Sequence, residues 1–385
     1  MKDITKILFI PVVLLSALIP VRLGGVWHAQ LVGLLFITFF FISSYIYNFN
    51  KELSIFSIIC LLSTFFISKF DARAIVILMQ LYFGIVVSYF ISFSNLKTRN
   101  YINIAILSLV VLQIFWLMLQ TYNIDPVFKS LANSKLDETV GLSAAKDQMG
   151  TFFALTMPVS LSFHPLLGLL NVAGCFISKS SFALVSAILS GLLYFYYTNR
   201  KLFKIVFISA VIIGIIFFSR FDKLRIADFK TRINVSRYAL SSVLEGHIDV
   251  GTTDNLRRVF CNPLFGFGFG RFLSIFPYVP QQVGFNYANE KFTHAHNDYV
   301  ELIFELGMTG LLFLLLLISN FIESFVKIGK DKELVLYFSV IAAYLLNASG
   351  NFLSHIAVSG AILMIYYGLY EARRRELSGQ VTVNC

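Results

Sequence analysis

Long apolar stretches separated by short polar segments run through this chain, and they predict its architecture. A helix of about 20 apolar residues, within a range of about 17–25, is needed to cross the hydrocarbon core of a bilayer. Twelve segments of the 385-residue chain reach or approach that length, and we expect each to be a transmembrane helix. They are residues 5–21, 27–48, 53–70, 72–93, 101–122, 148–164, 165–178, 181–197, 202–219, 298–320, 333–353 and 355–371. Pro158 and Pro165 are expected to kink or break the helices around them, which neighbouring helices tolerate.

The composition excludes a soluble enzyme. Hydrophobic residues make up 57% of the chain and charged residues only 14%, with a mean hydropathy of +0.76. Soluble domains carry about 25% charged residues, so the sequence predicts an all-α polytopic membrane protein. Neither a disulfide framework nor a zinc site is predicted by the spacing of Cys60, Cys175, Cys261 and Cys385. The N-terminal apolar run lacks a small-residue cleavage site and is expected to be a retained first span.

Lysines and arginines between the apolar segments predict the orientation, because short cytoplasmic loops collect them. With both termini in the cytoplasm, nearly every predicted inner loop carries such residues. The expected organisation is nine spans in residues 1–219, a large outer loop at 220–297, and three spans with a cytoplasmic tail in 298–385. The net charge of +10 follows this orienting pattern and does not form the patch expected of a nucleic-acid-binding protein.

The outer loop at 220–297 is itself basic. It has ten basic and six acidic side chains, an excess of +4 on the side that orientation rules leave poor in positive charge. Long loops are translocated largely regardless of charge. Two alternatives explain the excess of positive charge: a solvated basic surface, or an anionic ligand held at the outer face. Lys179 and Arg220 stand at outer ends of spans, where they either snorkel or join the loop arginines around an anion.

Residues 293–310 end this loop and enter the next span. Asp298 and Glu301 have the spacing of a helix N-cap pair, so a helix is predicted to begin at Asp298. Its N-terminus, with free N–H groups and a partial positive charge, suits phosphate oxygens. His296 precedes that end and is either a general base, for which a pKa of about 6.5 is suitable, or a histidine that only hydrogen-bonds at the interface. No third ligand accompanies His294 and His296, and no metal is predicted.

Glu301 and Glu305 lie four residues apart on one face of the same predicted helix. A charge at the centre of a bilayer costs about 2.5–3.5 kcal/mol or more, so a carboxylate near the interface still needs a partner. An ion pair with a loop arginine is one interpretation of these glutamates, and a catalytic acid is the other.

Residues 262–272 read Asn-Pro-Leu-Phe-Gly-Phe-Gly-Phe-Gly-Arg-Phe. Alternating glycines allow tight turns and close approach of the backbone to a ligand. The spacing differs from the dinucleotide-binding GxGxxG motif. The segment is therefore either a backbone turn that approaches a ligand closely or an interfacial turn anchored by its phenylalanines.

Taken together, these motifs resemble the O-antigen ligase and polymerase family of bacterial envelope glycosyltransferases. The hallmark of that family is a His-Asn-type pair, a spacer and a GxxG at the end of a large periplasmic loop. In this chain the pair is His296-Asn297, and Gly307 and Gly310 supply the GxxG. The resemblance covers residues 140–320 by motif and the whole chain by topology.

Three further segments resemble family motifs more weakly. Residues 262–268 are similar to its Pro-Leu-x-Gly-x-Gly segment, residues 236–238 to its loop arginine motif, and residues 141–158 to its entry to a middle span. The chain departs from the pattern at two places. It has Ser180-Ser181 where the family often has Ser-Arg, and Asp147-Gln148 where it has asparagine.

The resemblance implies a GT-C-like protein of the bacterial inner membrane whose donor is a glycan linked to undecaprenyl diphosphate. The acceptor hydroxyl at the periplasmic face would belong to lipid A–core in a ligase, or to a growing glycan in a polymerase. Neither a cofactor nor nucleic acid is implied, and membrane lipids are the other partner. His296 is implied as the base, with Asn297 beside it. The implied diphosphate ligands are Arg237, Arg271, Arg220 and Lys179, and the implied supporting residues are His294, Glu301, Glu305, Gly307 and Gly310.

Two other classes of function compete with this one. A multi-pass solute transporter fits twelve spans and would use membrane-centre polar groups such as Asn347 and Asn351, but the internal repeat typical of transporters is not evident. A non-catalytic envelope scaffold would use the basic loop as a docking surface.

Overall fold

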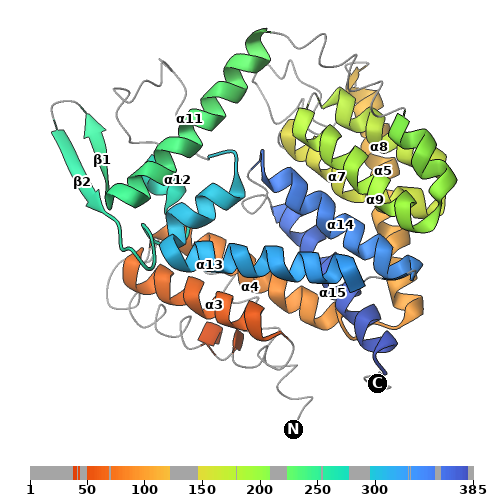
Figure 1. The fold of residues 1–385 in the computed structure, drawn as a ribbon, viewed down its shortest axis with the longest axis horizontal. Coiled ribbons are helices and arrows are strands. Elements are labelled where there is room, and N and C mark those ends of the chain that lie inside the picture. The colour runs from red at the N-terminus through yellow and green to blue at the C-terminus, as the bar shows by residue number, and fades with distance from the viewer. Residues whose placement is uncertain are drawn as a thin grey trace. The chain divides into compact units, whose positions relative to one another are not determined.

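The computed structural model describes the chain in separated stretches. They are residues 38–40, 42–43, 50–68, 71–121, 146–178, 180–208, 223–252, 255–276, 295–327, 329, 331–351 and 357–379. Outside them lie the predicted span 5–21, most of 27–48 and 202–219, and the candidate site residues Lys179, Arg220 and His294. The described part is mostly helical, with twelve helical segments and one two-stranded sheet (Figure 1).

Four helices in the described part are long and apolar enough to cross a membrane. They are α4 (Ala72–Ile91), α5 (Leu96–Thr121), α9 (Ser181–Thr198) and α13 (Asp298–Lys327). Each coincides with a predicted span. The shortest predicted span, 165–178, forms α8 (Pro165–Ile177), which has 13 residues and is capped by His164. Candidate spans of this kind indicate a multi-pass membrane protein.

Most of the other predicted spans are helical but shorter or more polar. The segment 53–70 forms α3 (Lys51–Leu62), which continues into a π-helical turn, η1 (Ser63–Ile67). The remaining helices of this kind are α7 (Lys146–Phe163), α14 (Lys332–Ala348) and α15 (Ala357–Leu377). As anticipated, Pro165 begins a helix, whereas Pro158 lies inside α7.

The chain forms two compact units, residues 1–89 with 230–320 and residues 90–229 with 321–385. The second unit is built on close helix packing through small residues. In α8, a Cβ on Gly174 would come within 2.3 Å of the Phe153 ring of α7. Gly350, just after α14, is equally tight against Phe182 of α9. Small residues allow helix backbones to approach closely where lipid supplies no hydrophobic drive for association.

Buried amides add directional contacts to this packing. Asn347 donates from Nδ2 to the Thr151 hydroxyl at 3.0 Å, and Asn351 donates to Asn347 Oδ1 at 2.7 Å. All three residues are buried. Of the two asparagines that a transport hypothesis would invoke, Asn347 therefore joins α14 to α7, and Asn351 supports it from just beyond α14.

An ionic cluster joins α5, α14 and α15 in the same unit. Arg99, whose side chain is 1% exposed, donates to Glu333 at 3.2 Å and to Glu376 at 2.7 Å. Arg373 bonds Asp331 at 2.6 Å and also contacts Glu376 at 2.9 Å. These residues belong to the predicted cytoplasmic ends of the spans.

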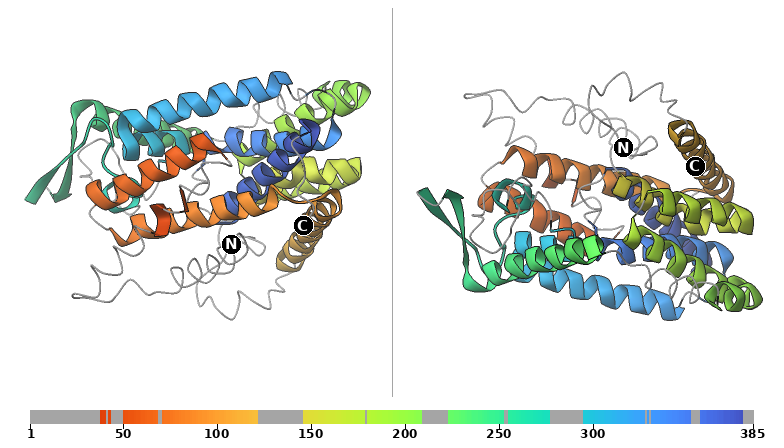
Figure 2. Two further views of the ribbon diagram at one scale, coloured as in Figure 1. Left: turned by 90° about the horizontal axis from the view of Figure 1, so that it is seen from below. Right: turned by 90° about the horizontal axis from the view of Figure 1, so that it is seen from above.

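The first unit holds most of the segment that was predicted to be the outer loop. It contains α3, most of α4, most of α11 (Lys223–Glu245), the short α12 (Phe272–Ile275) and the first part of α13. Figure 2 shows α3 running beside α13, where the rings of Phe56 and Phe313 stack with centroids 3.8 Å apart. The described part is mostly helical, as the all-α prediction requires, but this unit also has an antiparallel hairpin of β1 (His247–Thr252) and β2 (Asn255–Phe260), which the sequence did not predict.

Candidate functional site

The helix that carries the His296 motif begins at Asp298, as predicted. Its capping group is one residue earlier than predicted: Asn297 Oδ1 accepts from the N–H groups of Tyr299 at 3.0 Å and Val300 at 3.2 Å. An asparagine before the first helical residue satisfies donors that have no partner within the helix. The Asn297 amide is therefore committed to the helix end, which gives it a structural role alongside any catalytic one.

His296 adopts a left-handed backbone with φ 51°, and no other non-glycine residue in the described stretches has a positive φ. Such a conformation costs on the order of 1 kcal/mol or more in a residue with a Cβ, and the surrounding contacts must enforce it. The preceding residue, Ala295, is fully buried, and its N–H donates to Glu301 Oε1 at 2.7 Å. Its carbonyl accepts from Ser236 Oγ of α11 at 3.4 Å. The half-buried imidazole thus follows an anchored peptide.

The element α13 is interrupted at Gly307, where φ is 56° and ψ is −134°. The glycine-rich segment fills the break with four backbone hydrogen bonds. Before the break, the carbonyls of Phe304 and Glu305 accept from Phe267 and Gly268, each at 3.0 Å. After it, the N–H groups of Met308 and Thr309 donate to the carbonyls of Pro263 and Leu264, each at 3.1 Å. We call this arrangement the glycine clasp, formed by residues 263–268 and 304–309.

Glycine is required on both sides of the clasp. A Cβ on Gly266 would lie 2.4 Å from the Phe304 carbonyl oxygen, and one on Gly307 would lie 2.6 Å from the Gly266 nitrogen. Both neighbours are backbone atoms, which cannot rotate away. Gly310 is tight for a related reason, since its Cβ would meet the Leu302 carbonyl oxygen at 2.5 Å across the bend. The GxxG spacing therefore serves to bend α13 and admit a second chain segment.

The far end of the glycine-rich segment is held by the π-helical turn η1 and by Ser68, which follows it. Phe269 donates its N–H to Ser63 Oγ at 2.9 Å, and its carbonyl accepts from Ser68 Oγ at 2.8 Å. Gly270 lies against the Ala74 backbone at the start of α4. A π-turn within a helix often marks a functional site. In this unit the turn and the residue after it place two hydroxyls on the backbone N–H and carbonyl of one residue, Phe269.

The second glutamate of α13 anchors the arginine of the same segment. Glu305 is 3% exposed, and its Oε1 accepts from the N–H of Phe272 at 3.0 Å. Phe272 begins α12, so the carboxylate lies at the N-terminal end of that short helix beside Arg271. Glu301 and Glu305 are one turn apart, a rise of about 6 Å. One face of α13 therefore anchors both the His296 loop and the Arg271 loop.

Arg271 is a partly desolvated cation. Its Nη1 donates to the Phe267 carbonyl at 3.3 Å, and its buried Nε has no hydrogen-bond partner within the described part of the chain. Burial lowers the pKa of Arg271, and the nearby charge of Arg257 lowers it further, against an opposing effect of Asp71. An arginine so placed remains charged at neutral pH. An anion bound at its Nε would replace the hydrogen bond and the solvation that the cation loses on burial.

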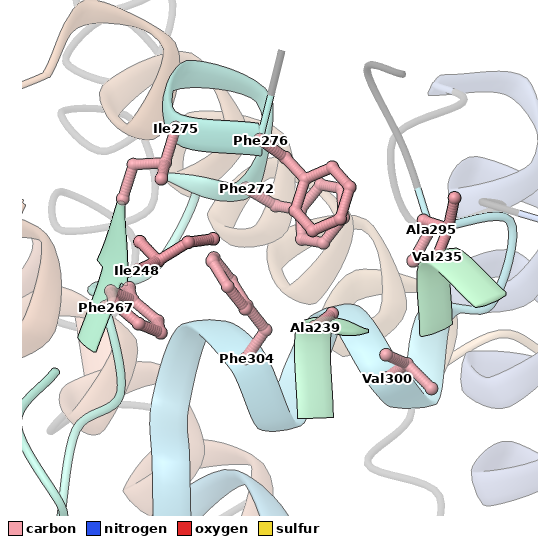
Figure 3. Packing of buried hydrophobic residues seen from close by; sticks show 10 residues of the cluster. All are labelled: Val235, Ala239, Ile248, Phe267, Phe272, Ile275, Phe276, Ala295, Val300 and Phe304. Carbon is pink, nitrogen blue, oxygen red and sulfur yellow. The ribbon is translucent and has the colours of Figure 1, made fainter. Parts of the chain in front are cut away.

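An apolar cluster gives these loops a rigid base. Figure 3 shows Phe304 of α13 among residues of the glycine-rich segment, α12, the hairpin and α11. The rings of Phe304 and Phe267 stack with centroids 4.4 Å apart, and Phe272 meets Phe304 edge-on at 5.0 Å. These three phenylalanines are fully buried, so they form the interior of this unit.

The structure brings together part of the predicted site. His296, Asn297, Glu301, Glu305 and Arg271 share one arrangement around the first two turns of α13, while Arg237 is exposed on α11 next to Ser236. Sequence reasoning did not single out Ser63, Ser68 or Arg257, and it included Ser236 only as part of the motif at 236–238. Serine in a helix carries little signal by itself, and Arg257 was one of ten similar charges in the loop.

The described part of the first unit has the groups needed for acid–base and anion chemistry. No group of three His, Cys, Asp or Glu side chains that could hold a metal ion occurs among the residues described. No protein-family model matches the chain, and no curated protein is significantly similar to it. What the site does must therefore be inferred from its own geometry.

Proposed function

We propose that the chain is a glycosyltransferase of the O-antigen ligase type in the inner membrane of a bacterium, with both termini cytoplasmic. It would move a glycan from undecaprenyl diphosphate to a hydroxyl of lipid A–core at the periplasmic face. The observation that supports this most strongly is that Glu301 and Glu305, one turn apart on α13, anchor the backbone next to a histidine, His296, and next to a partly desolvated arginine, Arg271.

The division of labour follows from the chemistry of a diphosphate donor. The acceptor hydroxyl loses its proton to His296 as its oxygen forms a bond to the anomeric carbon. The bond from that carbon to the diphosphate oxygen breaks, and the negative charge remains on the diphosphate. Arginine suits this charge because its planar fork of N–H donors matches phosphate oxygens. A histidine with a pKa near neutrality suits the proton. Arg271 is the diphosphate ligand that the geometry favours, with Arg237 the next candidate.

The carboxylates have a positioning role in this proposal. Glu301 holds the peptide before His296, and Glu305 holds the peptide after Arg271. Each accepts from a backbone N–H, so neither needs to exchange a proton with substrate. Preorganised groups of this kind lower the reorganisation required when charge develops.

The test is glycan transfer in membranes that contain His296→Ala at normal levels. We expect transfer to fall by about 10²–10⁴-fold, the usual contribution of a general acid–base group. His247→Ala is the matched control, because His247 lies in the same outer loop and bonds only the Glu245 carbonyl among its described contacts. Undiminished transfer by His296→Ala would refute the mechanism.

The glycolipid profile of a deletion strain shows which acceptor the protein uses. Unligated long chains support a ligase, and single capped repeats support a polymerase that uses the same donor. Accumulation of substrate in proteoliposomes would instead favour a transporter. Substitutions at Asn347 or Asn351 should then abolish this accumulation while the packing of α14 against α7 is retained.

A further inference from the structure

A group of exposed apolar side chains lies at the base of the hairpin and the glycine clasp. Phe260 is 75% exposed, Leu264 57% and Met308 51%. We call these three residues the outer apolar patch. They contrast with residues 266–270 of the same segment, which are all buried. Large apolar side chains grouped at a surface indicate an interaction site.

Met308 is the first residue of a lipid-facing row. After the break, residues 308–327 of α13 are long enough, at about 30 Å, to span the hydrocarbon core. Exposed apolar residues recur along this part at intervals that place them on one face. They are Met308, Leu312, Leu315, Leu316, Ile318, Ile322, Phe325 and Val326. In a helix of this length and composition, such a face meets acyl chains.

Leu264 extends that row beyond the helix. The N–H groups of Met308 and Thr309 donate to the carbonyls of Pro263 and Leu264, so the turn lies against the outer end of the row. Asn262 Oδ1 fixes the turn by accepting from the N–H groups of Leu264 at 2.9 Å and Phe265 at 3.1 Å. Leu264 is therefore held rigidly where the lipid-facing surface of α13 begins.

The hairpin register places Phe260 on the outward side. Ile248 pairs with Val259, and Ile248 is buried in the apolar cluster, so that face points inward. Phe260 and Arg258 belong to the opposite face, because side chains alternate along a strand. Arg258 forms a 3.2 Å ion pair with Asp249 across the strands. The outward face thus changes from apolar to charged within two residues.

We propose that the outer apolar patch inserts into the outer leaflet of the membrane that the protein spans, at the boundary between acyl chains and phosphate headgroups. The occupant is bulk bilayer lipid. Its apolar residues continue the lipid-facing row, and the charged pair next to Phe260 meets the polar side of the boundary. The glycine clasp, Arg271 and His296 are then fixed close to headgroup depth.

The test uses single tryptophans in reconstituted full-length protein. Trp27 and Trp116, the two native tryptophans, are replaced by phenylalanine. Leu264→Trp and Phe260→Trp are then compared in vesicles with and without brominated acyl chains. Leu312→Trp is the lipid-facing reference, and Asp249→Trp is the water-facing reference on the same hairpin face. The exposed positions 260, 264 and 312 tolerate these changes, whereas Asp249→Trp removes the ion pair with Arg258, so the native fold of every variant is checked by monodispersity in detergent.

We expect Leu264→Trp and Phe260→Trp to emit at shorter wavelength than Asp249→Trp and to be quenched by brominated lipid nearly as strongly as Leu312→Trp. Aqueous iodide should quench them weakly. Strong quenching by iodide together with insensitivity to brominated lipid would overturn the proposal. Neither result depends on glycan transfer, so the patch and the enzymatic proposal fail or stand separately.

Discussion

Replacing Gly307 by alanine tests the glycine clasp directly. The residue has φ 56° and ψ −134°, which a side chain with a Cβ adopts only under strain of about 1–3 kcal/mol. The added methyl would also lie 2.6 Å from the Gly266 nitrogen and 2.8 Å from the Pro263 carbonyl oxygen. Overpacking of this kind costs about 1–3 kcal/mol more. Gly307→Ala should therefore destabilise the protein by about 2–6 kcal/mol, a large share of a typical stability of about 5–15 kcal/mol.

A second glycine separates backbone strain from steric overlap. Gly246 has φ 76°, and a Cβ on it meets no atom within 4 Å. Gly246→Ala should therefore lose only the strain of a left-handed residue, about 1–2 kcal/mol. The free energies of unfolding are compared in detergent micelles by denaturant titration, with thermal midpoints as a second measure. The difference between the two variants should be at least about 1 kcal/mol.

A double-mutant cycle shows whether the two clasp glycines act together. Gly266→Ala should be as harmful as Gly307→Ala, because each methyl would enter the space of the other residue's backbone. Once one substitution has opened the clasp, the second should cost little, so the two losses should be strongly non-additive. Fully additive losses, or a Gly307→Ala variant as stable as Gly246→Ala, would refute the account of the clasp.

Three further predictions concern caps and charges. Asn297→Asp should retain capping and glycan transfer while Asn297→Ala loses about 1 kcal/mol; loss of transfer in a folded Asn297→Asp would assign the amide a role in the reaction. Arg99→Met should cost about 2–3 kcal/mol in a denaturant titration, less than a fully buried pair because Glu333 is 23% exposed; an unchanged midpoint would contradict this. Hydrogen bonds from Arg373 lower the pKa of Asp331. The stabilisation of the folded protein by this carboxylate is therefore present above the ordinary aspartate pKa and is lost as the pH falls through the lowered pKa of Asp331. Arg373→Met should make the thermal midpoint depend less on pH in this acid range.

The sequence was most informative where local signals are sufficient. Apolar length predicted α4, α5 and α9, and the polar residues around Asp298 predicted where α13 begins. Such features depend on neighbours within a few residues, and their energies are local. Both of these predictions were made without knowledge of any tertiary contact.

The break in α13 could not be predicted from local pattern. Residues 298–320 read as one continuous apolar helix, and a single Gly307 is tolerated inside many helices. The break exists because a distant segment supplies four backbone hydrogen bonds to it. The hairpin was missed for a similar reason. Its strands are only six residues long, so the alternation of apolar and polar side chains is short, and Ile248 and Val259 pack against the apolar cluster formed by distant residues.

The glutamates show how the structure changes the interpretation of a charge. As residues of an unbroken span, Glu301 and Glu305 would lie at and below the membrane interface and would call for an arginine or a catalytic proton. The break at Gly307 separates them from the 20 residues that follow, so the first part of α13 need not enter the hydrocarbon core. There, each carboxylate accepts from the backbone of a loop, and negative charge near a helix N-terminus is favourable. Because of the break at Gly307, Glu301 and Glu305 need not be charges inside the membrane, and they anchor the two loops of the candidate site.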